Sequence, residues 1–348
     1  MKRTSVVILN WNGAELLKKF LPTVLLHTQS EDCEVVVADN ASTDNSVKVL
    51  KQQFPGVKLI QLNKNYGFAE GYNRALQQVN SKYVVLLNSD VETSPNWLNP
   101  LIEHLETNSK IAAVQPKILS YNNKSMFEYA GAAGGFIDRY GYPFCRGRIL
   151  HKLEKDKGQY DEPIEIFWAT GACLCMRRED YIKAGGLDAD FFAHMEEIDL
   201  CWRLLARGKK IVCLPQSKVY HVGGASLDSE SPRKVHLNFR NNLLMLYKNA
   251  SFIQLVEVFF MRIALDSAAA LHFLVQGKWR HANSVVKAYI DFVRMIPRFK
   301  HKREENLSKT IQKRNPQLYK GSMLFDFYFR GKQKYSDIFK ENTPSNLN

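Results

Sequence analysis

The sequence predicts an α/β fold in which a mostly parallel sheet is flanked by helices and followed by a helical C-terminal extension. Short apolar runs of strand length alternate with segments of helical periodicity through about the first 120 of the 348 residues. The strand-like runs are apolar throughout, which indicates burial on both faces and favours a parallel sheet covered by helices. From residue 236 onward the spacing of apolar residues is helical only.

Each strand is predicted where apolar and β-branched residues follow one another, and each helix where apolar residues recur every three or four positions. The predicted strands cover residues 6–10, 34–39, 57–63, 82–90, 111–119 and 210–221. The predicted helices cover residues 14–26, 40–54 after N-cap residues, 68–79, 96–108, 180–186, 196–208, 238–249, 252–275 and 282–296. Residues 120–165 lose the pattern and are expected to form an excursion beside the functional site.

The charge of the chain is concentrated near its C-terminus. Residues 251–348 hold 17 Lys and Arg against 8 Asp and Glu, a balance of +9, and the remaining 250 residues contribute +4 of the net +13. A basic tail of this kind suits nucleic acid or an anionic membrane surface, and a solvated basic face is the alternative. Most of the six cysteines lie in apolar runs, which indicates buried thiols in a reducing compartment rather than a zinc site.

Polar side chains end four of the predicted strands. Because ligands bind at the carboxyl ends of strands in open parallel sheets, these endings predict a polar cleft. A carboxylate at such a point suits Mg²⁺ or Mn²⁺, and a second can accept a hydrogen bond from a base or a ribose. No phosphate-binding glycine motif of the P-loop or dinucleotide type is present. The endings are Asn10 and Asn12, Asp39, Asn63, and Asn88-Ser89-Asp90.

The order of several motifs resembles glycosyltransferase family 2, whose members have the GT-A fold and transfer sugars from nucleotide diphosphates. The resemblance covers roughly residues 4–225. It rests on VVILNWNG, VVVADNASTDNS, NKNYGFAEGYNRAL, LLNSDVE and FFAHMEEIDLCWRLLARGKKI. Two departures are visible: the family's Asp-x-Asp is reduced to Asn88-Ser89-Asp90, and Tyr72 stands where relatives often have Arg.

The resemblance implies a role for each matching position. Its donor-binding residues would be Asn10, Asn12, Asp39, Gly67, Asn73, Asn88 and Ser89. A Mg²⁺ or Mn²⁺ ion would be held by Asp90 and His221. Glu197 would be the catalytic base, and Glu196 and Asp199 would orient the acceptor or neighbouring side chains. Trp168 would stack on a sugar ring of the acceptor, with a core position as the alternative. It also implies a GT-A catalytic domain over residues 1–235, with a donor half at about 1–119 and an acceptor half at about 160–235, followed by a helical, basic region over 236–348.

The acidic cluster in MEEIDLCWR can also be interpreted from helix geometry and the chemistry of carboxylates. Residues 196 and 199 share a helix face, and residue 197 points about 100° away from residue 196. Crowded carboxylates raise one another's pKa, which suits a general base near neutral pH. The alternatives are that Glu196 is the base, or that the acids only stabilise the start of their helix.

The expected function is that of an inverting, rhamnosyltransferase-like enzyme of surface polysaccharide assembly. It would move a sugar from a dTDP- or UDP-sugar to a hydroxyl of a glycan or a lipid-linked saccharide. The alternatives are a sugar-nucleotide nucleotidyltransferase and a non-catalytic nucleic-acid- or membrane-binding protein. Interleaved aromatic and basic residues of a nucleic-acid-binding strand are not seen, so no nucleic-acid partner is expected.

The C-terminal region raises the question of a membrane. Residues 252–275 are apolar but contain Glu257, Arg262 and Asp266, so no membrane span is expected there. One interpretation is a helical pair packed on the catalytic domain. The other adds the basic stretch 294–305 and predicts docking on an anionic membrane surface. The N-terminal apolar run is too short for a signal peptide, which predicts a cytoplasmic protein, peripheral on the inner face of the membrane in the second interpretation.

Overall fold

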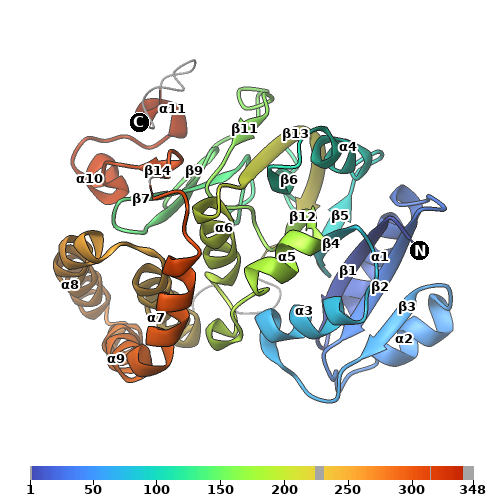
Figure 1. Cartoon of the computed structure of the whole chain (residues 1–348), viewed down its shortest axis with the longest axis horizontal. Coiled ribbons are helices and arrows are strands. Elements are labelled where there is room, and N and C mark those ends of the chain that lie inside the picture. The colour runs from blue at the N-terminus through green and yellow to red at the C-terminus, as the bar shows by residue number, and fades with distance from the viewer. Residues whose placement is uncertain (1, 224–230, 314, 340–348) are drawn as a thin grey trace.

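A mixed sheet runs through the centre of the computed structural model, with helices on both of its faces (Figure 1). The structure describes residues 2–223, 231–313 and 315–339. The strand order is β11-β13-β6-β12-β4-β1-β2-β3, and β5 pairs with β13. These strands are β1 (Thr4–Asn10), β2 (Cys33–Asp39), β3 (Lys58–Gln61), β4 (Tyr83–Asn88), β5 (Val91–Thr93), β6 (Ile111–Ser120), β11 (Ile164–Glu165), β12 (Cys173–Arg177) and β13 (Lys210–His221).

The N-terminal half of the sheet is parallel, as predicted: β1 lies between β2 and β4, and β2 pairs with β3. Strands β6 and β13 are also parallel. The sheet as a whole is mixed because β12 runs antiparallel between β4 and β6, and β11 and β5 run antiparallel to β13. A fully buried strand such as β12 is apolar whether it runs parallel or antiparallel to its neighbours, so its sequence could not reveal its direction.

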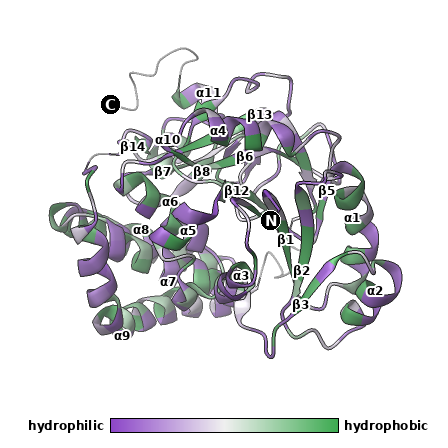
Figure 2. Ribbon diagram, turned by 45° about the vertical axis from the view of Figure 1, so that its right-hand side comes forward, coloured by the Kyte–Doolittle hydropathy of each residue, from purple (hydrophilic) through white to green (hydrophobic). Residues whose placement is uncertain are grey.

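The apolar strands are buried on both faces, because successive side chains of a strand point to opposite sides. Along β1, Val7 joins the hydrophobic cluster on one face of the sheet, and Val6 and Ile8 join the cluster on the other. Figure 2 shows hydrophobic residues gathered along these strands. The covering helices are α1 (Ala14–His27), α2 (Ser46–Gln53), α3 (Gly67–Gln77), α4 (Asn99–Thr107), α5 (Arg178–Ala184) and α6 (Glu196–Ala206).

The segment without a periodic pattern forms a second, smaller sheet. Its strand order is β10-β9-β8-β7-β14, and β14 comes from far along the chain to lie parallel to β7. The C-terminal residues are therefore part of this layer. The strands are β7 (Gly135–Asp138), β8 (Pro143–Cys145), β9 (Arg148–Ile149), β10 (Lys152–Leu153) and β14 (Leu318–Tyr319).

The C-terminal region is largely helical, as predicted, and its long helices lie side by side next to α6 (Figure 1). The helices are α7 (Pro232–Asn249), α8 (Phe252–Val275), α9 (Trp279–Ser308), α10 (Met323–Tyr328) and α11 (Tyr335–Ile338). Helix α8 has the predicted bounds. Helix α9 continues past Pro297, where the prediction ended, because this proline is accommodated inside the helix.

Helix α8 bears on the question of a membrane that the sequence raised. Its length of 24 residues and the mean hydropathy of 1.7 in its most apolar 18-residue stretch are sufficient, by length and composition, for a membrane span. The three charged residues were expected to exclude this. Only 17% of its most apolar stretch is buried within the protein.

Candidate active site

The ends of β1 and β2 bring three of the predicted donor-binding residues together. The register places Asn10 beside Asp39, and Asn10 Nδ2 donates to Asp39 Oδ1 at 3.0 Å. Ser42 also binds this carboxylate, through its hydroxyl at 2.6 Å and its backbone N–H at 3.0 Å. Asn12 Oδ1 accepts from the backbone N–H of Thr43 at 2.7 Å. The carboxyl ends of β1 and β2 therefore form a polar edge held together by these hydrogen bonds.

Trp11 projects from this edge and was not singled out from the sequence. It lies between Asn10 and Asn12, and 51% of its surface is exposed. A large aromatic side chain that stays exposed beside buried polar groups can stack on a flat ring of a ligand. Its position directly after a buried strand was the one available signal.

The glycine loop joins the donor edge to the segment before α6. Gly67 has a φ of +76°, and a Cβ there would lie 2.6 Å from the Phe192 ring. The backbone N–H of Phe68 donates to Phe192 O at 2.9 Å. Asn40 holds the same loop from the end of β2, donating to Gly67 O at 3.0 Å. Gly67 therefore allows a close backbone approach between the two halves of the site.

Two predicted site residues have other roles in the structure. The Asn73 amide oxygen accepts from the Tyr181 hydroxyl at 2.6 Å and from Leu187 N at 3.0 Å, and Asn73 Nδ2 donates to Leu187 O at 2.8 Å. Its amide thus fixes the chain between α5 and α6 instead of facing a donor. Trp168 is buried, and its Nε1 donates to Phe136 O at 2.9 Å. Its ring belongs to the core and is not placed to stack on an acceptor sugar.

Asp90 and His221 meet at the end of the sheet. Asp90 follows β4, His221 ends β13, and the antiparallel pairing of β5 with β13 sets His221 opposite Val91. His221 Nε2 lies 3.1 Å from Asp90 Oδ1, and both side chains are buried. Asn88 Nδ2 lies 3.4 Å from the same nitrogen, and Ser89 is half-buried in the turn between Asn88 and Asp90. The sequence motif and the distant histidine are therefore one cluster.

Glu128 completes this cluster and was missed by the sequence analysis. It is buried, and its Oε2 lies 3.4 Å from His221 Nδ1. Burial by itself would lower the pKa of His221, but Asp90 and Glu128 raise it to about 10. Glu128 lies in the stretch without a periodic pattern, so nothing in the sequence connected it with residue 221.

The Asp90–His221 pair fits a divalent cation in its donor chemistry. One carboxylate oxygen and one imidazole nitrogen 3.1 Å apart can share an ion once His221 has lost the proton that its raised pKa favours, and a carboxylate on the other ring nitrogen is the usual orienting partner of a metal-bound histidine. In the described ranges, no group of three or more His, Cys, Asp or Glu side chains could hold a metal alone. Further ligands would have to come from substrate phosphates and water, as is common for Mg²⁺.

Helix α6 begins with two adjacent glutamates that are largely shielded from solvent. Glu196 is buried and Glu197 half-buried, and Oε2 of each has no hydrogen-bond partner in the described part of the chain. Burial raises the pKa of Glu197 to about 7. Burial, and then the charge of Glu197, raise the pKa of Glu196 well above its ordinary value. Near neutral pH, Glu197 can therefore ionise and accept a proton while Glu196 keeps its own.

The backbone before α6 is strained. Phe192, His194 and Met195 all have positive φ, between 64° and 71°. Non-glycine residues in this region cost of order 1–3 kcal/mol each and are kept only where surrounding contacts determine them. Asn241 of α7 supplies such contacts, because its Nδ2 lies within 2.9 Å of the carbonyl oxygens of Phe191, Ala193 and His194.

Asp199 faces the protein interior and not an acceptor. It is fully buried, its Oδ2 accepts from Arg203 Nε and Lys248 Nζ at 2.9 Å each, and its Oδ1 accepts from Asn249 at 2.8 Å. Lys248 also pairs with Asp188 at 2.8 Å. Of the two roles expected for Asp199, these contacts correspond to the orientation of neighbouring side chains, and they anchor α6 to α7.

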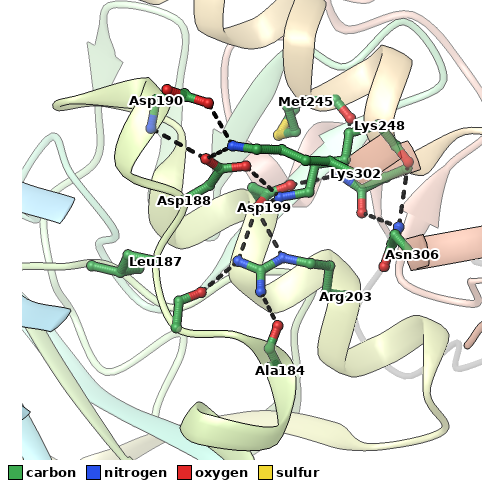
Figure 3. Close-up of polar contacts among 12 residues, drawn as sticks. Ala184, Leu187, Asp188, Asp190, Asp199, Arg203, Met245, Lys248, Lys302 and Asn306 are labelled. Carbon is green, nitrogen blue, oxygen red and sulfur yellow. Dashed lines mark hydrogen bonds and ion pairs between the residues drawn. The ribbon is translucent and has the colours of Figure 1, made fainter. Parts of the chain in front are cut away.

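Figure 3 shows how this ion network extends to α9. Lys302 of α9 contacts both Asp188 and Asp190, at 2.6 Å for Asp190 Oδ2. Burial alone would raise the pKa of Asp188, but Lys248 and Lys302 hold it well below its usual range. We name the set Asp188, Asp190, Asp199, Arg203, Lys248 and Lys302 the anchor network.

Comparison with known proteins gives a consistent result. The family model described as "Glycosyl transferase family 2" matches residues 5–185. The chain is 26% identical over 232 residues to N-acetylglucosaminyl-diphospho-decaprenol L-rhamnosyltransferase of Mycobacterium tuberculosis, covering 62% of this chain and 75% of that protein. It is 25% identical over 224 residues to rhamnosyltransferase WbbL of Escherichia coli, covering 62% of this chain and 82% of the relative.

A solved structure shares the fold. The structure of GalNAc-T7 with UDP, GalNAc and Mn²⁺ superposes with a TM-score of 0.56 at 18% identity. The match covers 71% of this chain and about half, 48%, of the length of that one. At this identity the likeness concerns the fold.

Replacing Asp199 with Asn should destabilise the protein by about 3–5 kcal/mol, because it leaves the buried charges of Lys248 and Arg203 without their shared carboxylate. Urea unfolding followed by circular dichroism would measure the change. Glu179→Gln, which removes an exposed carboxylate from its pair with Lys183, is the matched control and should change little. Equal stability of the Asp199→Asn variant and the wild type would contradict the anchoring role.

Proposed function

The chain belongs to glycosyl transferase family 2 and is a glycosyltransferase, and we propose that it is an inverting one that uses a dTDP- or UDP-sugar donor. The observation that carries this proposal is Glu197, a carboxylate with a pKa of about 7 at the start of α6. A contact chain from Asn40 through Gly67 to Phe192 links that helix to the donor edge. Proton transfer and donor binding can therefore occur at one site.

Glu197 would act as the general base. Its carboxylate takes the proton of an acceptor hydroxyl as that oxygen bonds to the anomeric carbon of the donor sugar. The bond from this carbon to the diphosphate breaks on the opposite face, so the configuration inverts. Glu196, with its raised pKa, stays protonated and adds no second negative charge beside the base.

The donor edge would hold the nucleotide. Asp39, fixed by Asn10 and Ser42, can accept from a base N–H or a ribose hydroxyl, and the exposed ring of Trp11 can stack on the base. Asp90 and His221 would hold a Mg²⁺ or Mn²⁺ ion, which when bound neutralises charge on the leaving diphosphate. Asn12, Asn88 and Ser89 stay predicted donor contacts at this edge.

The relatives support a finer assignment. Both named relatives are rhamnosyltransferases, and the name of the mycobacterial one describes an N-acetylglucosaminyl-diphospho-decaprenol acceptor. We therefore assign a rhamnosyl donor and a lipid-linked diphosphosaccharide acceptor, used at the cytoplasmic face of a membrane during surface polysaccharide assembly. Family membership favours this over the nucleotidyltransferase and the non-catalytic alternatives.

Glu197→Gln should lower sugar transfer by about 10²–10⁴-fold while donor binding stays close to wild type, because only the proton acceptor is removed. Release of dTDP or UDP from a panel of nucleotide sugars, with a lipid-linked saccharide as acceptor, would measure transfer. Donor affinity would be measured by calorimetry, and Glu179→Gln is the matched surface control. Transfer unaffected in Glu197→Gln but abolished in Glu196→Gln would move the base to Glu196.

The pH dependence follows from the same group. A carboxylate base works in its deprotonated form, and burial raises the pKa of Glu197 to about 7. We expect kcat/KM to rise about tenfold per pH unit below this value and to level off above it. Steady-state rates at fixed ionic strength would test this. A profile that stays flat down to about pH 5 would contradict a base with a raised pKa.

Glu128→Gln should weaken Mn²⁺ binding about 10- to 100-fold, because the partner that orients His221 loses its charge. Electron paramagnetic resonance titration of the full chain with Mn²⁺ and UDP would measure this without turnover. Glu92→Gln is the matched control, since Glu92 lies on neighbouring β5 but pairs with Lys124. Equal Mn²⁺ affinity of Glu128→Gln and the wild type would remove Glu128 from the site.

A further inference from the structure

Helix α8 has its polar and apolar sides reversed relative to a helix of an ordinary soluble domain. Arg262 and Asp266 are 2% and 1% exposed, whereas Ile253 and Phe260 are 83% and 75% exposed. A surface helix normally turns its apolar stripe to the core and its charges to water. The other exposed apolar side chains of α8 are Phe252, Val256, Met261, Ile263, Leu271, Leu274 and Val275.

The buried charges fasten α8 to the rest of the protein. Arg262 pairs with Asp266 at 3.0 Å and contacts Asn242 of α7 and Tyr140 O. Asp266 accepts from the hydroxyls of Tyr142 and Tyr289 at 2.8 Å each. Extracting α8 to cross a bilayer would break this cluster and leave buried charges unpaired, at high cost. The helix is therefore suited to lie against a membrane and not to span one.

Helix α9 carries a second exposed apolar stripe. Trp279, Val286, Ile290 and Val293 are exposed and recur at helical spacing. The two helices pack side by side and antiparallel, since Phe259 contacts Phe292 and Phe273 contacts His281. Their inner sides face α7: Arg262 of α8 contacts Asn242, and Phe292 of α9 contacts Tyr247. Both stripes consequently face outward, and we call them together the outer apolar face.

Basic residues flank the outer apolar face. Arg280, Lys287 and Arg294 recur every seven residues along α9, which places them in one row about 60–100° from the apolar stripe. Acidic side chains near this surface form ion pairs: Glu257 pairs with Arg139, and Asp291 pairs with Arg294 and His236. An apolar face with a basic border is the signature of a helix that lies in a membrane interface.

We propose that the outer apolar face docks on a bilayer that contains anionic lipids, with α8 and the first half of α9 lying in the interface. The apolar side chains would enter the acyl boundary, and the basic row would meet the lipid phosphates. The positive charge of Arg280, Lys287 and Arg294 is complementary to such a surface. The biological reason for docking rests on the proposed function, because a lipid-linked acceptor is presented at a membrane.

The surface differs from the one expected from sequence. The basic stretch 294–305 was expected to dock, but Arg298 and Lys302 pair with Asp190 and Asp188, and Arg303 binds the carbonyl oxygens of Tyr247 and Ala250. Much of its charge therefore holds α9 to the protein. The docking surface moves to α8 and the N-terminal half of α9.

Flotation of the full-length chain with liposomes tests the proposal. We expect binding to phosphatidylcholine vesicles that contain phosphatidylglycerol, weaker binding to pure phosphatidylcholine, and loss of flotation in the Ile253→Asp/Phe260→Asp variant. Leu26→Asp/Ile182→Asp, at exposed apolar positions on α1 and α5, is the matched control and should float like the wild type. Arg280→Gln/Lys287→Gln/Arg294→Gln should weaken binding to anionic vesicles about fivefold per residue.

Several results would overturn the proposal. These are equal flotation of Ile253→Asp/Phe260→Asp and the wild type, no binding of the wild type to anionic vesicles, or a solution dimer that this variant converts to a monomer. The last result would assign the face to a second copy of the chain. Flotation requires neither donor nor acceptor, so the two proposals can fail separately. Sugar transfer without flotation would contradict only the docking proposal, and flotation without sugar transfer would contradict only the proposed function.

Discussion

The buried carboxylate of Asp199 is the interaction on which the geometry of the active site depends. It accepts hydrogen bonds from Arg203 of its own helix and from Lys248 and Asn249 of α7. These bonds fix the rotation of α6 about its own axis. On a helix, residue 197 lies about 200° from residue 199. Anchoring Asp199 inward therefore turns Glu197 toward the opposite side. Of three clustered acids, one serves as anchor, one remains protonated, and one is available for proton transfer.

The anchor network also connects the two surfaces that sugar transfer to a lipid-linked acceptor would need. Lys302 ties α9 to Asp188 and Asp190 just before α6, and Arg262 ties α8 to α7. A set of helices joined by these contacts thus lies between the outer apolar face and Glu197. In the proposed docking, the orientation of the protein on the bilayer would fix the height of Glu197 above it. The reactive hydroxyl of an acceptor of fixed length would then lie at the height of Glu197.

Local pattern was sufficient to predict the family, the parallel half of the sheet, and the bounds of β13 and α8, because these depend on runs of apolar residues and on adjacent motifs. It failed where a partner lies far away in the sequence. Asn73 binds Leu187, Trp168 binds Phe136 O, and Glu128 binds His221, and none of these pairs has a signature of spacing. Helix α8 is the strongest case: Arg262 and Asp266 looked like interruptions, yet their partners Tyr142, Asn242 and Tyr289 turn them inward.

The strained segment before α6 connects the C-terminal helices with the candidate active site. Phe192, His194 and Met195 hold left-handed conformations that the local chain would not keep by itself. The clamp that holds them, Asn241, is on α7. A domain boundary at residue 235 stays a prediction, but it would separate this clamp from the segment that it holds and Lys248 from Asp199. We therefore infer that the catalytic unit extends at least through α7, since Glu197 owes its position to contacts made after that boundary.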